Sequence, residues 1–307
     1  MKTASMSIHI SIIIPAFKAA QVLPRALASI AGQNIFLPQQ QIAQQGTKQG
    51  AGQPRLKPHQ VEVVIAADDH HDYRFASSYL PHDMKCRCLP PVSMGMGIST
   101  GPGATRNRGI AASTGAYLSF LDADDTWSPD YLTRLWPLAW RHGACFAVTS
   151  VLNAKGKELM VLGQPDEGGR RALPSRQITP RHFGVWPGSF HPVVRRDLSP
   201  GFDDGAGQDV FHALEVLGRV GGRAPLVQSA AYQLHLSPGS VTANPAFTRR
   251  IDRRYRDWQR RYQHQQTALT GMARRDALQA LSLRRAYNHA FAESGGHQDG
   301  FYGFLAK

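Results

Sequence analysis

Residues 117–130 read YLSFLDADDTWSPD, an apolar stretch that ends in a cluster of carboxylates. The short apolar run Tyr117–Leu121 predicts a buried strand. Asp122 and Asp124 follow on alternate residues just past its end. Two carboxylates so placed can hold a divalent cation that prefers oxygen ligands, and Mg²⁺ or Mn²⁺ there can bridge to substrate phosphates. Short acidic runs are also common on protein surfaces, so the pattern by itself does not establish a metal site.

Two further strands are predicted upstream. Ile8–Ile14 is rich in β-branched residues and is bounded by Pro15, whereas Val61–Ala67 leads directly into Asp68 and Asp69. Because open α/β sheets bind ligands at the carboxyl ends of their strands, we expect the functional site at that edge. Glycine and proline punctuate three predicted helices, over residues 22–31, 102–114 and 131–142.

The composition is typical of a globular α/β protein. Its 307 residues, 42% of them apolar, suffice for one large domain or for a domain with a smaller appendage. No apolar stretch approaches the ~20 residues that cross a bilayer, and no signal-peptide pattern is visible, so a cytoplasmic location is expected. The cysteines Cys86, Cys88 and Cys145 are interpreted as reduced thiols without assigned chemistry.

A formal net charge of +13 predicts an anionic partner. Residues 249–285 contain eleven arginines and three aspartates, and Ile251, Tyr255, Trp258 and Tyr262 recur there at helical spacing. This pattern predicts an amphipathic helix with an arginine-rich face. Two alternatives stay open, namely packing on the main domain with solvated arginines and attachment to an anionic membrane. No nucleic acid is expected as a partner, because no nucleic-acid-binding motif accompanies the charge.

Two regions lack a clear pattern of regular structure. Residues 33–60 contain nine glutamines in low-complexity order, and we expect most of this segment to be a mobile surface loop. Beyond Gly156, a sequence rich in glycine, proline and arginine predicts substrate-binding loops.

Five segments, taken in order, resemble the motifs of the inverting family 2 glycosyltransferases of the GT-A fold, and they lie within residues 1–240. They are the opening strand Ser11–Phe17, the acidic loop region Val61–Asp72, the helix segment Gly101–Gly115, the D-x-D strand Phe120–Asp125, and Gly201–Asp204 followed by Gln208-Asp209. Each match alone is weak, but five matches in order with compatible spacing form a specific pattern.

The resemblance implies an α/β fold class, with a GT-A type nucleotide-sugar-binding sheet flanked by helices and a C-terminal helical extension. Residues 1–245 would form the glycosyltransferase domain, including the insert 33–60, and residues 246–307 the basic extension. The implied partners are a nucleotide-sugar donor and a carbohydrate or lipid-linked acceptor. Peripheral contact with an anionic membrane, at the inner membrane face, stays open.

The resemblance also implies how the nucleotide base is bound. Pro15, Ala16 and Phe17 would pack against the base, and Asp68 would accept a hydrogen bond from it. The family usually has two aspartates followed by Gly-Ser, whereas His70 follows here, so the register is uncertain by one residue. As structural alternatives, Pro15 ends a strand and Asp68 is a solvated turn carboxylate.

For the diphosphate and the metal, the resemblance implies further residues. Arg106 would lie near the donor diphosphate, or alternatively cap or solubilise its helix. Asp122 would contact the ribose or the metal and Asp124 the metal itself, a Mn²⁺ or Mg²⁺ cofactor. His235 is a candidate phosphate or metal contact, although Gln233 stands where the family's Y-R-x-H segment has arginine. A separate transition-metal site at 70–72, with two histidines and an aspartate, is an alternative.

Asp209 would be the general base that takes the proton from the acceptor hydroxyl. Helix capping is its structural alternative, because Asp often caps helices. Gln208 stands where a glutamate commonly precedes the base, which removes a negative charge from the acceptor site. Trp186 and His191 lie in the segment expected to approach the acceptor, with packing beneath a loop as the alternative.

The predicted function is the inverting transfer of a sugar from a nucleotide-sugar, expected to be a UDP-sugar, to an acceptor hydroxyl in bacterial polysaccharide or glycolipid assembly. The enzyme would be a metal-dependent hexosyltransferase-type glycosyltransferase. One alternative is a GT-A-like nucleotidyltransferase, and another is a polyanion-binding protein with a degenerate transferase fold. The absence of a glycine-rich phosphate loop after the first strand argues against the former. The intact Asp122-x-Asp124 and Asp209 argue against the latter.

Overall fold

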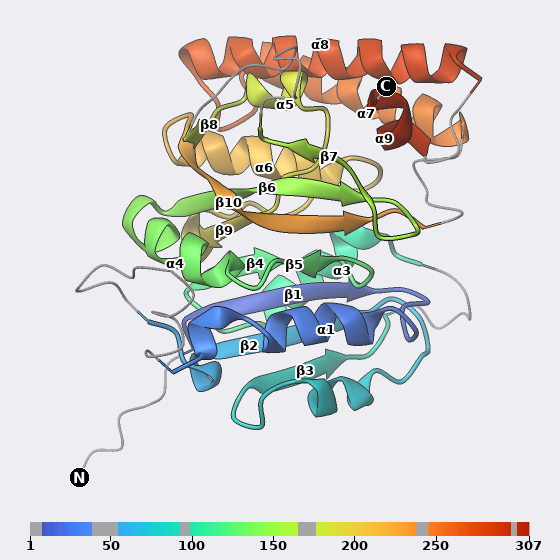
Figure 1. Cartoon of the computed structure of the whole chain (residues 1–307). Coiled ribbons are helices and arrows are strands. Elements are labelled where there is room, and N and C mark those ends of the chain that lie inside the picture. Colours follow the sequence, from blue (N-terminus) through green and yellow to red (C-terminus); the bar gives the residue numbers. More distant parts are fainter. Residues whose placement is uncertain are drawn as a thin grey trace. The chain divides into compact units, whose positions relative to one another are not determined.

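The computed structural model describes residues 8–38, 55–92, 99–164, 176–237, 245–295 and 300–306. The chain forms two compact units, and its elements are labelled in Figure 1. The first unit consists of the residues up to Cys145 together with His191–Ser199. The second consists of Phe146–Phe190 together with the residues from Pro200 onward.

The first unit is built on a mostly parallel sheet. The strands β1 (Ile10–Ala16), β2 (Val61–Ala67), β3 (Lys85–Leu89) and β4 (Tyr117–Phe120) pair in the order β3-β2-β1-β4, and β9 (Pro192–Arg195) joins β4 in antiparallel orientation. Ile13 of β1 lies between Val64 of β2 and Phe120 of β4. These three strands are buried along almost their whole length, as expected for mostly apolar strands covered on both faces.

Helices and short turns complete the first unit. They are α1 (Leu23–Ala31), α3 (Pro102–Ala112), α4 (Tyr131–His142), the two-residue strand β5 (Thr126–Trp127), and the 3-10 turns η1 (Asn34–Phe36), η2 (Pro58–Gln60), η3 (Arg74–Tyr79) and η4 (Arg196–Leu198). α3 packs closely on β1 and β2. A Cβ at Gly109 would lie 2.5 Å from Cγ2 of Ile13, so glycine permits this approach.

A buried carboxylate joins β1, β2 and the end of α3. Glu62 accepts hydrogen bonds at Oε1 from Ser11 Oγ at 2.7 Å, Thr114 Oγ1 at 3.0 Å and Gly115 N at 3.2 Å. Burial opposes ionisation of Glu62, but the hydrogen bonds outweigh it and hold the pKa of this carboxyl below its ordinary value. The helix ends at Ala112, two residues before its predicted end, because the backbone is extended at Ser113, and Thr114 then bonds to Glu62.

Most predicted elements of the first unit are confirmed. β2 and α4 have the predicted bounds, Val61–Ala67 and Tyr131–His142. β1 runs from Ile10 to Ala16 instead of from Ile8 to Ile14, so the expectation that Pro15 ends this strand is wrong: Pro15 lies within it, opposite Ala66 of β2. α1 begins at Leu23 because Val22 is its N-cap residue.

The expectation of a surface loop beginning at Gln33 is wrong at the two ends of the segment. Gln33 is buried, its Oε1 accepts from Leu132 N at 2.8 Å, and its Nε2 donates to the carbonyl oxygens of Ser29 and Ser128. Leu56, near the other end, is also buried. The rest of the insert, residues 39–54, lies outside the described residues.

The second unit begins within β6 (Ala144–Leu152), at Phe146, and contains both strands and helices. β10 (Ala224–His235) runs parallel to β6, while β7 (Glu158–Leu162) and β8 (Gln177–Ile178) pair antiparallel with β6 and β10, respectively. The helices are α5 (His182–Val185), α6 (Gln208–Arg219), α7 (Pro245–Gln263), α8 (Gly271–Glu293) and α9 (Gly300–Leu305).

The basic C-terminal region contains two long helices instead of the single helix predicted. The helix breaks after Gln263, and Gln265 has a left-handed backbone with φ of 58°. The predicted stripe on α7 is confirmed, because Ile251, Tyr255, Trp258 and Tyr262 are all buried. α8 packs on α7 and α5, as Figure 1 shows for the red and orange helices.

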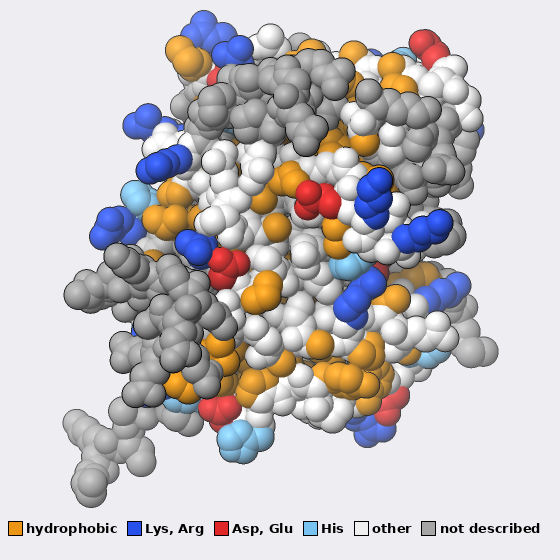
Figure 2. Space-filling model, in the orientation of Figure 1, with side chains coloured by type: hydrophobic (Ala, Val, Ile, Leu, Met, Phe, Trp, Pro, Cys, Tyr) orange, Lys and Arg blue, Asp and Glu red, His pale blue; other side chains and the backbone are white. Residues whose placement is uncertain are grey.

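Several arginines of these helices are not part of a solvated face. Arg254 and Arg261 pair with Asp203, Arg285 pairs with Asp252 at 2.8 Å, and Arg284 is buried. On the face drawn in Figure 2, the visible Lys and Arg side chains mostly stand apart and do not form one continuous patch. Among the described helices, none is long and apolar enough to cross a membrane.

Candidate active-site regions

The first candidate region lies at the carboxyl ends of β1, β2 and β4. Phe17 follows β1, Asp68 and Asp69 follow β2, and Asp122 and Asp124 follow β4. β1 lies between β2 and β4, and all three are parallel. The predicted edge of the sheet therefore does gather these side chains within the first unit.

An ion pair fixes the first aspartate of the D-x-D segment. Arg106 projects from α3, is only 2% exposed, and donates through Nη2 to Oδ1 of Asp122. Burial works against ionisation of Asp122, but Arg106 and His191 outweigh it and hold the pKa of this carboxyl below its ordinary value. The Asp122 carboxylate is therefore ionised at neutral pH.

The pKa of Asp124 is shifted in the opposite direction from that of Asp122. Its side chain is at the exposed rim, and its backbone carbonyl accepts a hydrogen bond from Arg25 Nη2 at 2.5 Å. Desolvation and the neighbouring Asp122 carboxylate raise the pKa of Asp124, although Arg25 and Arg106 act in the other direction. A bound cation would relieve the repulsion between the two carboxylates.

The residues at this edge fit a divalent metal that takes only some of its ligands from the protein and the others from a substrate or water. In the part of the chain that the structure describes, no three His, Cys, Asp or Glu side chains are grouped to hold a metal by themselves. Asp122 and Asp124 would supply two oxygen ligands, and phosphate oxygens or water would supply the others, as is usual for Mg²⁺. The histidines and the aspartate of residues 70–72 do not form such a group.

Both aspartates after β2 hold neighbouring backbone in place. Asp68 accepts from Ser99 Oγ, from Thr100 Oγ1 at 2.5 Å and from the amides of Thr100 and Gly101. Burial opposes its ionisation, yet these hydrogen bonds hold the pKa of Asp68 below its ordinary value. Asp68 thus fastens the segment that begins α3, and its role toward a base stays a prediction.

Asp69 organises the turn after β1. It accepts from the Lys18 amide, from Tyr73 Oη at 3.0 Å and from the His71 amide at 3.1 Å. Lys18 has a left-handed backbone with φ of 53°, a conformation that non-glycine residues rarely adopt without such support. This anchoring function of Asp69 was not predicted from the sequence.

The turn after β1 presents an aromatic ring. Phe17 is 39% exposed, and Lys18 Nζ lies 5.3 Å from the centroid of its ring. Ala16 is buried and Pro15 is partly buried, so only the Phe17 ring offers a broad face among these three residues. Such a ring can stack on a nucleotide base.

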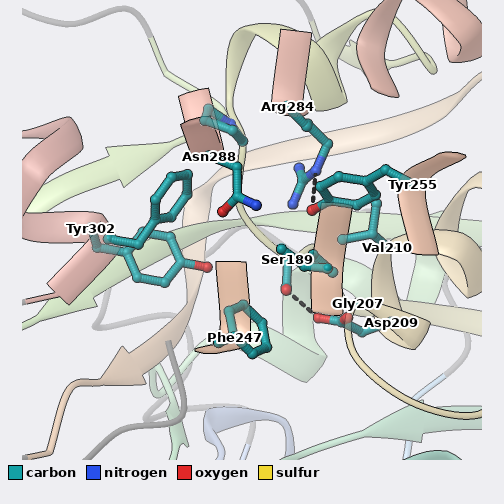
Figure 3. A pocket seen from close by; sticks show the side chains of 12 residues that line it. Ser189, Gly207, Asp209, Val210, Phe247, Tyr255, Arg284, Asn288 and Tyr302 are labelled. Carbon is teal, nitrogen blue, oxygen red and sulfur yellow. Dashed lines mark hydrogen bonds between the residues drawn. The ribbon is translucent and has the colours of Figure 1, made fainter. Parts of the chain in front are cut away.

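The second candidate region is a cavity of about 110 Å³ within the second unit, shown in Figure 3. The start of α6 contributes Asp209, and the loop before β9 contributes Ser189, whose Oγ donates to Oδ2 of Asp209. The C-terminal helices supply the opposite walls. The remaining lining residues are Pro187, Gly207, Val210, Phe247, Ile251, Tyr255, Arg284, Asn288, Phe301 and Tyr302.

The local geometry of α6 explains how Asp209 reaches the cavity. Gly207 occupies the N-cap position with φ of 71°, so Asp209 does not cap the helix and the capping alternative is wrong. A Cβ at Gly207 would lie 2.5 Å from Cδ1 of Ile251, which makes glycine the residue that fits there. The Asp209 side chain points to Ser189 and the cavity (Figure 3).

The nearby carboxylate Asp203 is committed elsewhere. It accepts hydrogen bonds from Arg254, from Trp258 Nε1 at 3.0 Å and from Arg261 at 3.1 Å. Burial opposes its ionisation, but these partners hold the pKa of Asp203 below its ordinary value. Asp209 is therefore the carboxylate that faces the cavity.

The other predicted site residues, Trp186, His191 and His235, are divided between the two units. Trp186 is fully buried and stacks on His182 with ring centroids 5.1 Å apart, so it packs beneath its loop and offers no face to a sugar. His191 belongs to the first unit, is buried, and acts electrostatically on Asp122. His235 ends β10 in the second unit.

Sequence reasoning missed the contribution of the C-terminal helices to the cavity. Tyr255, Arg284, Asn288 and Tyr302 come from three helices that carry no recognised motif. The buried stripe of α7 was the one available signal, because it showed that this helix packs against other parts of its unit.

Comparison with known proteins provides the family. Residues 11–164, half of the chain, match the model of glycosyl transferase family 2. The chain is also 25% identical over 248 residues to the succinoglycan biosynthesis protein ExoO of Rhizobium meliloti (strain 1021). That match covers 76% of this chain and 62% of ExoO, so the chain spans about three fifths of the length of this relative.

Solved structures share the fold. The fragment 1–349 of S. aureus TarS has a TM-score of 0.56 at 15% identity, over 94% of this chain and 74% of that one. The same fragment in complex with UDP-GlcNAc has a TM-score of 0.51 at 16% identity, over 81% of this chain and 66% of the fragment. The mannosyltransferase PcManGT from Pyrobaculum calidifontis, in complex with GDP-Man and Mn²⁺, has a TM-score of 0.58 at 13% identity. The match covers 98% of this chain and 74% of PcManGT. The predicted α/β, GT-A type fold is confirmed.

Proposed function

The chain belongs to glycosyl transferase family 2, and we propose that it transfers a sugar from a UDP-sugar to an acceptor hydroxyl with inversion at the anomeric carbon. The observation that carries this proposal is the pair Asp122 and Asp124 just past the carboxyl end of β4, in a parallel part of the sheet. One carboxylate is kept ionised by Arg106, and the other has a raised pKa. Such a pair favours a cation, and a cation favours a diphosphate.

The proposed donor site lies on the first unit. Asp122 and Asp124 would hold Mn²⁺ or Mg²⁺, which when bound neutralises charge on the departing diphosphate. The Mn²⁺ in the PcManGT structure and the UDP-GlcNAc in the TarS structure support the choice of metal and of base. Phe17 would stack on the base, with Pro15 and Ala16 beneath it. We also keep His235 as a proposed phosphate or metal contact.

The proposed acceptor site is the cavity beside Asp209. The Asp209 carboxylate takes the proton of the acceptor hydroxyl, the freed oxygen forms a bond to the anomeric carbon, and the bond from that carbon to the diphosphate oxygen breaks. The electron pair of the broken bond leaves with UDP. Ser189, which donates to Oδ2 of Asp209, would orient the carboxylate.

The acceptor is proposed to be a carbohydrate or a lipid-linked carbohydrate of bacterial polysaccharide assembly, because the relative ExoO is a succinoglycan biosynthesis protein. Residues 1–245 are proposed as the transferase domain, and the helices of residues 246–307 as an extension that shapes the acceptor site. Contact of the extension with an anionic membrane stays a proposal, and the face drawn in Figure 2 shows no continuous basic patch.

The experiment that tests this function combines ligand binding with turnover. Thermal-shift measurements with UDP, GDP, CDP and ADP, each with and without Mn²⁺, identify the base and the metal requirement. Release of UDP from UDP-GlcNAc and UDP-glucose, with and without oligosaccharide acceptors, then measures transfer. Stabilisation by UDP that increases with Mn²⁺ supports the proposal, whereas no response to any nucleoside diphosphate contradicts it.

A further inference from the structure

Arg284 is a buried cation in the wall of the Asp209 cavity. It projects from α8 and is 5% exposed. Three of its N–H groups bond to neutral oxygens: Nε to Tyr255 Oη at 2.9 Å, and Nη1 to the carbonyls of Phe183 at 3.1 Å and Gly188 at 3.0 Å. The guanidinium plane is therefore held in a fixed orientation before any ligand arrives.

Nη2, the remaining nitrogen of this guanidinium, has no hydrogen-bond partner in the described part of the chain. Among the residues that the structure describes, Nη2 of Arg284 donates no hydrogen bond and Arg284 forms no ion pair with a carboxylate. The next residue differs in this respect, because Arg285 pairs with Asp252 at 2.8 Å. A buried charge without an ion-pair partner is unfavourable, so the cavity has an unfilled requirement for an anion.

The surroundings of Arg284 suit a charged sugar. Asn288 is anchored through Nδ2 to the carbonyl of Thr248 at 3.0 Å, and its amide lies toward the centre of the cavity. The rings of Phe247 and Tyr302 also line the cavity, and aromatic faces suit the apolar faces of sugars. The cavity therefore combines a cation, an amide and two aromatic rings around one space.

Asp209 does not form a direct ion pair with Arg284 among the described contacts. Its Oδ2 accepts from Ser189, and no described ion pair joins it to Arg284. Burial raises the pKa of Tyr255. Arg284 acts against this rise and Asp209 adds to it, so both charges act electrostatically on Tyr255. The base and the guanidinium are thus separate groups of one cavity, available to different parts of one acceptor.

We propose that the cavity takes an anionic acceptor sugar, with Nη2 of Arg284 pairing with a carboxylate or phosphate substituent while Asp209 faces the attacking hydroxyl. This inference rests on the proposed function for the assignment of the cavity to the acceptor. A guanidinium suits both kinds of anion, because its planar N–H groups match the oxygens of either. Arg284 would then determine acceptor specificity.

The test measures binding by the full chain without any donor, so its outcome is separate from that of the UDP-release assay. The probes are methyl β-D-glucuronide and glucose 6-phosphate, each compared with methyl β-D-glucoside, by titration calorimetry or ligand-observed NMR. We expect at least one charged probe to bind about tenfold or more tightly than the neutral glycoside. The preferred probe tells whether the natural anion is a carboxylate or a phosphate. Equal affinity for all three probes overturns the proposal.

Variants assign the preference to Arg284. Arg284→Gln should reduce it about tenfold, whereas Arg285→Gln, which changes an already paired arginine on the same helix, should retain it. Loss of the preference in both variants, or in neither, would assign it to general surface charge and overturn the proposal. UDP with Mn²⁺ at saturation should not displace the charged probe, and displacement would assign the guanidinium to the donor.

A second variant keeps the test valid if Arg284→Gln does not fold. Asp209→Asn removes the nearby negative charge, so it should bind the charged probe at least as tightly as the wild type does. If Arg284 merely neutralises Asp209, only the variant will bind the charged probe and the wild type will show no preference. That pattern contradicts the proposal.

Discussion

Arg106 and Asp122 form an ion pair between α3 and the end of β4, with the guanidinium almost fully buried. This pair keeps the first carboxylate of the D-x-D segment ionised and fixes its position beside Asp124. The arginine that sequence resemblance placed near the diphosphate thus bonds directly to a residue of the proposed metal site. Its effect on donor binding would be exerted through Asp122.

Replacing Arg106 should therefore affect folding and donor binding together. A fully buried pair that loses one partner costs about 3–5 kcal/mol, and Asp122 is 33% exposed, so we expect Arg106→Gln to lower the free energy of unfolding by roughly 2–4 kcal/mol. Arg195→Gln, which breaks the exposed pair with Asp197, should cost less than about 1 kcal/mol. Urea unfolding measures both, and equal costs would contradict the structural account of Arg106.

Asp124→Asn should separate stability from metal binding. In the wild type without metal, the raised pKa of Asp124 means that ionisation is unfavourable in the folded state. Stability from this group is present below the unfolded pKa near 3.8 and is lost as pH rises through the folded pKa. The metal-free variant should therefore be at least as stable as the wild type at pH 7, with a smaller loss between pH 4 and pH 7.

The same variant should lose the Mn²⁺-dependent part of the thermal shift produced by UDP, because one oxygen ligand with full charge is gone. Asp130→Asn, which alters a carboxylate paired with Arg134 on α4, is the matched control and should keep this shift. If a chelator leaves the UDP-induced shift of the wild type unchanged, the metal role of Asp124 is wrong.

Glu62 provides a pH test of the first unit. Its lowered pKa means that the stability it contributes is present above the unfolded value of 4.5 and is lost as pH falls through the folded pKa. Glu62→Gln replaces an ionised acceptor in a fully buried position and should cost about 1–3 kcal/mol at pH 7. It should also flatten the loss of stability in acid, which chemical denaturation at pH 7 and pH 4 measures. An unchanged acid dependence would show that Glu62 is not the titrating group.

The sequence predicted the carboxylate-lined edge of the first unit's sheet because its signals are local. Apolar strands such as Val61–Ala67 end in carboxylates, and parallel strands bring their ends to one edge whatever lies between them. The helix at Tyr131–His142 was equally predictable, because its apolar periodicity indicates the buried face and a glycine follows its last residue. In the structure Gly143 is left-handed, as is usual for a glycine at a helix end.

The Asp209 cavity could not be predicted in the same way. Ser189, Asp209, Tyr255 and Arg284 come from segments far apart in the chain, and no local pattern reports their proximity. Arg284 was counted with the solvated arginines, because a periodic sequence indicates a helix face but not what packs on it. Gln33 was likewise assigned to a loop, although it is buried and bonded to three backbone groups.

The central claim is that Asp209 is the general base, and Asp209→Asn tests it directly. Asparagine has nearly the same shape as aspartate but is a far poorer base. It can still accept from Ser189, so the cavity should stay intact. Asp204→Asn, at an exposed carboxylate in the loop before α6, is the matched control. Unfolding curves and UDP binding with Mn²⁺ should be near wild type for both variants.

The deciding measurement is the rate of sugar transfer by Asp209→Asn under saturating UDP-sugar and Mn²⁺, with an acceptor that the wild type uses. The account predicts a fall of roughly 10²-fold or more, the scale of general-base loss, together with unchanged donor binding and a near-normal rate for Asp204→Asn. Transfer by Asp209→Asn at close to the wild-type rate would contradict the account and remove Asp209 as the base.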